Sequence, residues 1–105
     1  MDPKYGGTRV IIAGEEFWVP GLSLRHMRAL TESGRIEKLT KITGMPTAEE
    51  QALVLDTIYE AVRENHPSVS RDFLDEAISS ADSVVLLKLI FSSSRVRVLP
   101  NVTSP

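Results

Sequence analysis

The residues that could support catalysis or metal binding are few in this sequence, and they lie far apart. The only histidines are His26 and His66, cysteine is absent, and the acidic residues do not cluster with a metal-binding spacing. The serine run at 92–94 has no partner base in the sequence that would activate a hydroxyl as a nucleophile. We therefore interpret both histidines as surface or capping residues, and we expect no catalytic residue, no bound metal and no cofactor.

The glycines and the single glycosylation motif give no functional signal either. Gly6, Gly7 and Gly14 do not open directly into a predicted helix, as the glycine-rich turn of a phosphate-binding loop would. Asn101-Val102-Thr103 matches a glycosylation acceptor, but the first residues show no apolar secretory signal, so we interpret it as a chance match. The sequence predicts a protein that is not an enzyme and that stays in the cytoplasm of the cell that makes it.

Composition predicts one small globular domain. The chain has 105 residues, of which 42% are hydrophobic and 25% charged, as in ordinary globular proteins. The formal net charge of −2 gives no overall attraction to nucleic acid or to an anionic membrane. The longest apolar run, Val84–Phe91, is far shorter than the roughly 20 residues that cross a bilayer. We therefore expect no membrane association, and nucleic acid is not the favoured partner.

Charge is unevenly distributed along the predicted helices. The segment 23–42 is mainly basic and the segment 47–65 is mainly acidic. One interpretation of the two segments is that each is a solvated face. Another is a head-to-tail contact in which the basic region of one copy meets the acidic helix of the next. The residues assigned to that contact are Arg28, Arg35, Glu49 and Glu60. Nucleic-acid binding by the basic region is a third reading, against which the net charge and the lack of interleaved aromatic residues both count.

The first ordered segment is a predicted β-hairpin. Residues 9–12 and 17–19 are rich in β-branched and aromatic residues and flank a turn that contains Gly14. Pro20 and Gly21 end the second strand. Because a lone two-stranded hairpin is marginal in water, it must lie on the helices or join another strand, and either arrangement leaves one edge free.

Helix start and stop signals divide the rest of the chain. Ser23 is the expected N-cap of a first helix, and Ser33-Gly34 break the following pattern into two short helices. Thr47 and Glu50 form a capping box that opens the longest helix.

Further signals follow the longest helix. It ends before Pro67, Ser70 caps a short helix, and Asp82 is the expected cap of the last one. The predicted fold is therefore α+β and mainly α, with an N-terminal β-hairpin followed by four to five short helices packed as a small bundle.

This pattern gives one domain at residues 8–91, between a flexible N-terminus at 1–7 and a flexible C-terminal tail at 92–105. Val96 and Val98 alternate with other residues in that tail, so it is able to add a strand on meeting a partner.

The segment Val84–Phe91 is the most apolar part of the chain, since only Lys88 interrupts it. A helix here is apolar in nearly every direction except a narrow arc that holds Lys88 and Ser92, and such a helix must be covered on all sides. The other helices can bury one side, so we expect another subunit or a client chain to cover the remainder. We place this contact on Val84, Val85, Leu87 and Phe91, with Leu86, Leu89 and Ile90 inward; the reverse allocation stays open.

Three stretches of the sequence resemble one known family. They are the hairpin Val10-Ile11-Ile12-Ala13-Gly14-Glu15-Glu16-Phe17, the helix entry Val19-Pro20-Gly21-Leu22-Ser23-Leu24, and the link Asn65-His66-Pro67-Ser68-Val69-Ser70-Arg71-Asp72-Phe73-Leu74. Over about residues 8–91 the chain is similar to the tail assembly chaperones of long-tailed bacteriophages and prophages. The motifs are short and structural, and His66 stands where that family often has an aromatic residue.

The resemblance implies a non-catalytic protein that self-associates and coats the tape measure protein before the tail tube polymerises around it. The tape measure protein and the tail tube protein are the implied partners, the host cytoplasm is the implied location, and the mature virion would lack the protein. In that family a longer product arises by ribosomal frameshifting, and this chain looks like the shorter product. Two alternatives stay open: a small phage or bacterial regulator that binds nucleic acid through residues 23–42, and a structural head–tail adaptor.

Overall fold

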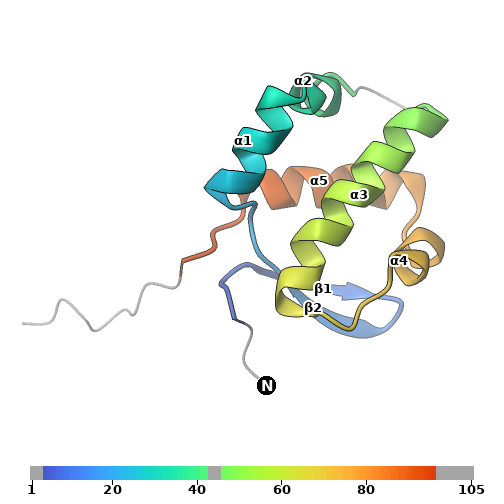
Figure 1. The fold of residues 1–105 in the computed structure, drawn as a ribbon. Coiled ribbons are helices and arrows are strands. Elements are labelled where there is room, and N and C mark those ends of the chain that lie inside the picture. The colour runs from blue at the N-terminus through green and yellow to red at the C-terminus, as the bar shows by residue number, and fades with distance from the viewer. Residues whose placement is uncertain (1–3, 43–45, 97–105) are drawn as a thin grey trace, which may run out of the picture.

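A computed structural model describes residues 4–42 and 46–96 and confirms the α+β fold class (Figure 1). An antiparallel hairpin of two strands comes first and five helices follow it. The elements are β1 (Thr8–Ile12), β2 (Glu15–Val19), α1 (Leu24–Glu32), α2 (Arg35–Thr40), α3 (Ala48–Asn65), α4 (Arg71–Ala77) and α5 (Ser80–Ser92). The longest helix, α3, is central: it contacts β2, α2, α4 and α5.

The hairpin turns through two residues with positive φ. Ala13 has φ 51° and Gly14 has φ 81°, which is the pattern of a type I′ turn, the turn whose twist matches that of the strands. The register pairs Ile12 with Glu15, and Val10 with Phe17. Ile12, Phe17 and Val19 are buried on the face that lies on the helices. The hairpin therefore gains from the helical layer the stability that two strands alone lack.

Serine and threonine caps set the helix starts, as the sequence predicts. Ser23 and Ser70 accept hydrogen bonds from the backbone of α1 and α4, and Thr47 and Glu50 form the complete capping box of α3. Asp82 was wrongly predicted to cap α5, since the cap is Ser79, whose Oγ accepts from Asp82 N at 3.1 Å. Asp82 instead lies in the first turn, where a carboxylate is favourable next to the helix dipole.

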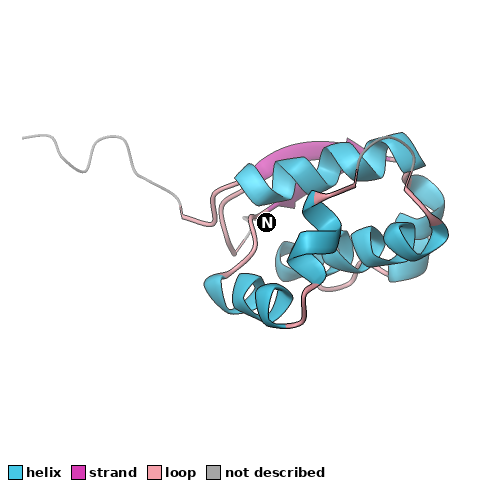
Figure 2. Cartoon of the chain, turned by 90° about the horizontal axis from the view of Figure 1, so that it is seen from above, coloured by secondary structure: helices cyan, strands magenta, loops and turns pink. Residues whose placement is uncertain are grey.

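The core lies between α3 and α5. Figure 2, the view from above, shows the strands in magenta partly covered by the helices in cyan. Val54, Ile58, Ala61 and Val62 of α3 are fully buried. They belong to one cluster with the buried residues of the hairpin and of the other helices, which are Ile12, Phe17, Val19, Leu30, Leu39, Leu74, Leu86, Leu87 and Ile90. None of the helices among the described residues is long and apolar enough to cross a membrane.

The domain is longer at both ends than the predicted range 8–91. Tyr5 N donates to Asn65 Oδ1 at 2.8 Å, and Gly6 N donates to the carbonyl oxygen of Arg95 at 3.1 Å. The first bond joins Tyr5 to α3 and the second joins Gly6 to the segment after α5, while the flexibility predicted for both ends stays a prediction. The rest of the predicted flexible ends, 1–3 and 97–105, lies outside the described residues.

Candidate interaction surface

Helix α5 has one face in the core and two flanks that leave it. Leu86, Leu87 and Ile90 fall within a single arc of the helix and are buried at 8%, 4% and 1% exposure. Lys88 lies on the opposite side and is exposed, as the sequence predicts. Between core and solvent lie two apolar flanks, Val84 and Phe91 on one side, and Val85 with Leu89 on the other.

The first flank lines a groove between α2 and α5. Val84, Leu87 and Phe91 form its α5 wall, and Leu39 and Ile42 form the other wall. Thr40 and Lys88 complete the lining of this groove, which has a volume of about 270 Å³. We call it the α2–α5 groove. Its walls are mainly aliphatic and aromatic, and Val84, Phe91 and Ile42 are only half-buried, so it offers apolar surface to another chain.

The second flank lines a groove between β1 and the start of α5, with the end of α4 closing one side. Val85 is 62% exposed on the helix side, and Ile11 is 60% exposed on the strand side. The groove has a volume of about 260 Å³ and is lined by Val10, Ile11, Ile12, Ala13, Ala77, Ile78, Asp82, Val85 and Leu86. We call it the β1–α5 groove. Asp82 is its single charged residue, in otherwise apolar surroundings.

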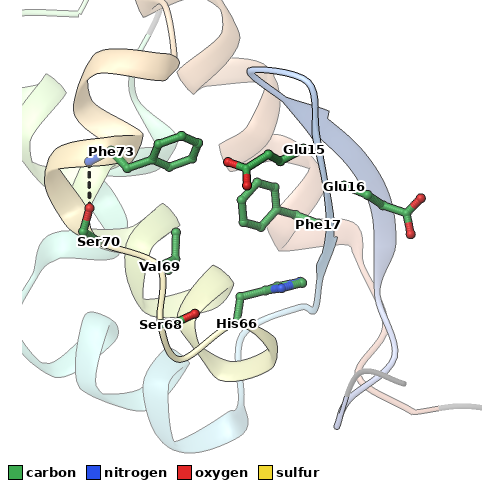
Figure 3. A pocket seen from close by; sticks show the side chains of 8 residues that line it. All are labelled: Glu15, Glu16, Phe17, His66, Ser68, Val69, Ser70 and Phe73. Atoms are coloured by element: carbon green, nitrogen blue, oxygen red, sulfur yellow. Dashed lines mark hydrogen bonds between the residues drawn. The ribbon is translucent and has the colours of Figure 1, made fainter. Parts of the chain in front are cut away.

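A third cavity, of about 320 Å³, lies between the hairpin and the link from α3 to α4 (Figure 3). The ring of Phe17 meets the His66 ring edge-on, with centroids 4.9 Å apart, and lies 6.1 Å from the ring of Phe73. Figure 3 shows the Glu15 carboxylate directed into the cavity and the Glu16 carboxylate directed away from it. Two of the stretches that carry the family resemblance thus line the same cavity.

Two polar side chains of that cavity, His66 and Ser70, are already used by the fold. His66 Nε2 accepts a hydrogen bond from Trp18 N at 2.9 Å, and Ser70 Oγ accepts one from Phe73 N at 3.0 Å as a helix cap. Burial lowers the pKa of His66, and a protonated ring could not accept the Trp18 bond. His66, which is also the C-cap residue of α3, therefore has a capping role, as the sequence predicts.

Asn65 and His66 together close the outer edge of β2 at Trp18. Asn65 Nδ2 donates to the carbonyl oxygen of Trp18 at 3.0 Å and to that of Tyr5 at 3.1 Å. Both outward backbone groups of Trp18, its N–H and its carbonyl, are thus bonded by side chains from the end of α3. These side chains replace the partner strand that this edge would otherwise need.

A neighbouring cluster fixes the end of α5 to α3. Arg95 donates to both carboxylate oxygens of Glu64, at 2.9 and 2.8 Å, and to the carbonyl oxygen of Gly21 at 2.8 Å. Its guanidinium also lies 4.0 Å from the ring centroid of Tyr5. The Glu64 bond raises the pKa of Arg95, so this pair stays charged. No pattern in the sequence indicates this cluster, because its members are far apart in the chain.

The predicted charge contact remains a prediction. Arg28, Arg35 and Glu49 are exposed, and none of them forms an ion pair within the described part of the chain. Glu60 is half-buried and pairs with Arg63 on the same helix at 3.3 Å. The basic side chains of α1 and α2 are therefore available to a partner, whereas Glu60 is partly engaged.

The predicted contact set on α5 needs one correction. Val84, Val85 and Phe91 lie on the flanks as expected, but Leu87 belongs to the core at 4% exposure, although it also lines the α2–α5 groove. Of the residues expected inward, Leu86 and Ile90 are buried and Leu89 is half-buried. The sequence did not identify Ile11 as part of this surface, although the free strand edge was expected.

Within residues 4–42 and 46–96, no group of three or more histidine, cysteine or acidic side chains is placed to hold a metal ion. No protein-family model, no curated protein and no solved structure matches the chain.

Proposed function

We propose that this domain is a non-catalytic tail assembly chaperone that self-associates and coats a tape measure protein during tail morphogenesis. The observation that carries the proposal is that apolar side chains on both flanks of α5, Val84 and Phe91 on one and Val85 on the other, line open grooves. Val85 and Ile11 are 62% and 60% exposed, and Val84 and Phe91 are half-buried. Apolar surface that the fold leaves uncovered next to concave walls is suited to binding another chain.

The α2–α5 groove suits a helical client. A tape measure protein is a long helical chain whose apolar stripe would aggregate if it were left uncovered. Side chains that recur every three or four residues on such a helix can enter a groove with apolar walls, here formed by Leu39, Ile42, Val84 and Phe91. Lys88 at the rim can pair with an acidic residue of the client.

The rest of the proposal follows from this role. The tape measure protein is the client, and the tail tube protein is a second partner that takes over as the tube forms. The domain acts in the host cytoplasm and is absent from the mature virion, because the tube replaces it around the client. The hairpin and link stretches that resemble the family support the assignment.

Genomic neighbourhood and co-purification test this function. A tail tube gene upstream and a very long tape measure gene downstream are expected, and the product of the long gene should co-purify with the domain. Val84→Glu should abolish co-purification by placing a charge in the α2–α5 groove. Ala81→Glu is the matched control, since Ala81 is exposed on the same helix and lines neither groove. Equal recovery of the client with both variants, or no recovery with the unaltered domain, would contradict the proposal.

A nucleic-acid-binding regulator is the second candidate, and the exposure of the basic residues favours testing it. Those on α1, α2 and the residue after α2 are exposed and form no ion pair among the described residues; they are Arg25, Arg28, Arg35, Lys38 and Lys41. A gel shift with duplex DNA at low salt separates the two functions. The chaperone proposal expects no shift, whereas tight binding that weakens steeply with salt would favour the regulator.

A further inference from the structure

The two edges of the hairpin differ in how their backbone groups are bonded. In a hairpin with a two-residue turn, the pair next to the turn is hydrogen-bonded and the pairs then alternate, so Arg9, Ile11, Glu16 and Trp18 direct their backbone groups outward. On β2, Asn65 and His66 bond both groups of Trp18. On β1, the backbone groups of Arg9 and Ile11 have no hydrogen-bond partner among the described residues.

The open edge of β1 borders the β1–α5 groove. Val10, Ile11 and Ile12 form one wall of that groove, and Val85 and Leu86 form part of the other. A strand added to β1 here would satisfy the outward N–H and carbonyl groups and lay alternate side chains against α5. The groove therefore selects an extended apolar segment with a side-chain period of two, not a helix.

Residues 96–99 of this chain have that pattern. Val96 and Val98 share one side of an extended segment, and Arg97 and Leu99 share the other. Val96, the last described residue, is 71% exposed. The segment from 96 to 105 carries one arginine and no acidic residue, whereas the only charge in the groove is Asp82. Pattern and charge both match the groove.

The segment cannot fill the groove of its own subunit. The carbonyl oxygen of Val96 would lie 3.3 Å from a Cβ at Gly6, so Val96 lies beside Gly6, ahead of β1. From Gly6 to Ile11 the strand advances five residues, about 17 Å, whereas Val98 lies at most about 7 Å beyond Val96. If the segment instead paired in parallel with β1 of its own subunit, Pro100 would reach the position that must bond β1 near Ile11. Proline has no N–H to donate to the strand at that position.

We infer that residues 96–99 of one copy add as a third strand to β1 of a second copy and fill its β1–α5 groove. The contact is heterologous, so each copy offers one segment and one groove, and successive copies form a ring or a filament. This inference specifies the self-association in the proposed function and rests on that part of it alone. Client binding at the α2–α5 groove is separate.

Light scattering across a concentration series tests the inference with full-length chains. The unaltered protein should show a mass that rises with concentration, and Val98→Asp should weaken this association by about tenfold or more. Val102→Asp is the matched control beyond Pro100 and should associate normally. An assembly unchanged by Val98→Asp would overturn the inference alone. A protein that stays a single subunit up to about 1 mM would overturn both the inference and the self-association in the proposed function.

Mixing two defective variants tests the head-to-tail arrangement. Val85→Glu alters the β1–α5 groove but leaves the segment 96–99 intact. Val98→Asp alters the segment but leaves the groove intact. Each variant alone should be a single subunit, while an equal mixture should form a dimer and nothing larger, since only one intact segment and one intact groove can pair. A mixture that remains monomeric, or a Val85→Glu protein that assembles as well as the unaltered chain, would overturn the inference. Circular dichroism confirms that both variants are folded.

Discussion

The two edges of the hairpin differ in how far their outward backbone groups are hydrogen-bonded within the subunit. The β2 edge is closed at Trp18 by Asn65 and His66, whose side chains bond both of its outward groups, whereas the outward groups of Glu16 have no partner among the described residues. The β1 edge has no such bonds among the described residues, and exposed Ile11 and Val85 stand beside it. Open strand edges invite pairing with other chains, and proteins usually protect them. The contrast indicates that the β2 side serves the stability of the subunit and the β1 side serves association.

Residues on the closed side should therefore control stability, and those on the open side should control assembly. The closed side comprises the β2 edge, the end of α3 and the Arg95 cluster. The open side comprises the flanks of α5 with their two grooves. Substitutions on the closed side test this division through the free energy of unfolding.

Gly21→Ala should cause the largest loss of stability, about 3 kcal/mol. A Cβ at Gly21 would overlap the carbonyl oxygen of Ser93, where the chain after β2 passes the end of α5, and backbone on both sides leaves little room to adjust. Urea unfolding measures the change. Gly34→Ala is the comparison: it has nothing within 4 Å but has φ 76°, so it should lose only about 1 kcal/mol. Equal losses would show that the close approach at Gly21 is not rigid.

Asn65→Ala should destabilise the subunit by about 2 kcal/mol, since it leaves the backbone groups of Tyr5 and the carbonyl of Trp18 without partners. Arg63→Ala, at the same end of α3, removes an exposed ion pair with Glu60 and an exposed contact with the Tyr59 ring, and should change stability by less than about 1 kcal/mol. Thermal or urea unfolding of both variants gives the comparison. A small effect for Asn65→Ala would mean that water readily closes the β2 edge instead.

Acid should weaken the β2 edge through His66. Burial lowers the pKa of His66 in the folded protein, so the unfolded chain binds a proton more readily, starting near the ordinary value of 6.5. The contribution of His66 is complete above about pH 6.5 and is lost as the pH falls toward the lower folded pKa.

His66→Gln supplies the control for this pH dependence. A glutamine oxygen can accept the Trp18 bond without titrating, so the variant should lose the part of the pH dependence that begins near 6.5. Urea unfolding at a series of pH values from about 7.5 to 5 measures it. Identical profiles for the two proteins would exclude His66 as the source.

Ala13→Asn should stabilise the hairpin by about 0.5 to 1 kcal/mol, the smallest of these effects. Ala13 has φ 51°, a left-handed conformation that asparagine tolerates better than alanine, and Asn-Gly is the preferred type I′ pair. Unfolding should shift to higher urea. A loss of stability would contradict the assignment of the turn.

Local signals in the sequence were sufficient to predict the helices and strands of the fold. The capping box at Thr47 and Glu50, the break at Ser33-Gly34 and the hairpin around Gly14 are all confirmed. Each depends on residues within a few positions of one another. The start of α5 was misplaced because Ser79 and Asp82 are both good caps, and only the structure shows which one the backbone uses.

The candidate surface was predictable only in part. The apolar run Val84–Phe91 located the correct helix, but its all-round apolarity gave no direction, so Leu87 was assigned to the contact and not to the core. That direction depends on where α3 packs, which no local pattern encodes. The groove with β1 and the Arg95 cluster bring together residues far apart in the chain, so neither could be found from spacing.

One measurement tests most directly whether α5 carries more apolar surface than one subunit covers. Light scattering should be compared between the unaltered protein and the double variant Val84→Glu/Val85→Glu, with circular dichroism recorded on both. The account predicts an assembly that grows with concentration for the unaltered protein, and a folded single subunit for the variant. A single subunit in both cases, or an unaltered assembly in the variant, would contradict it.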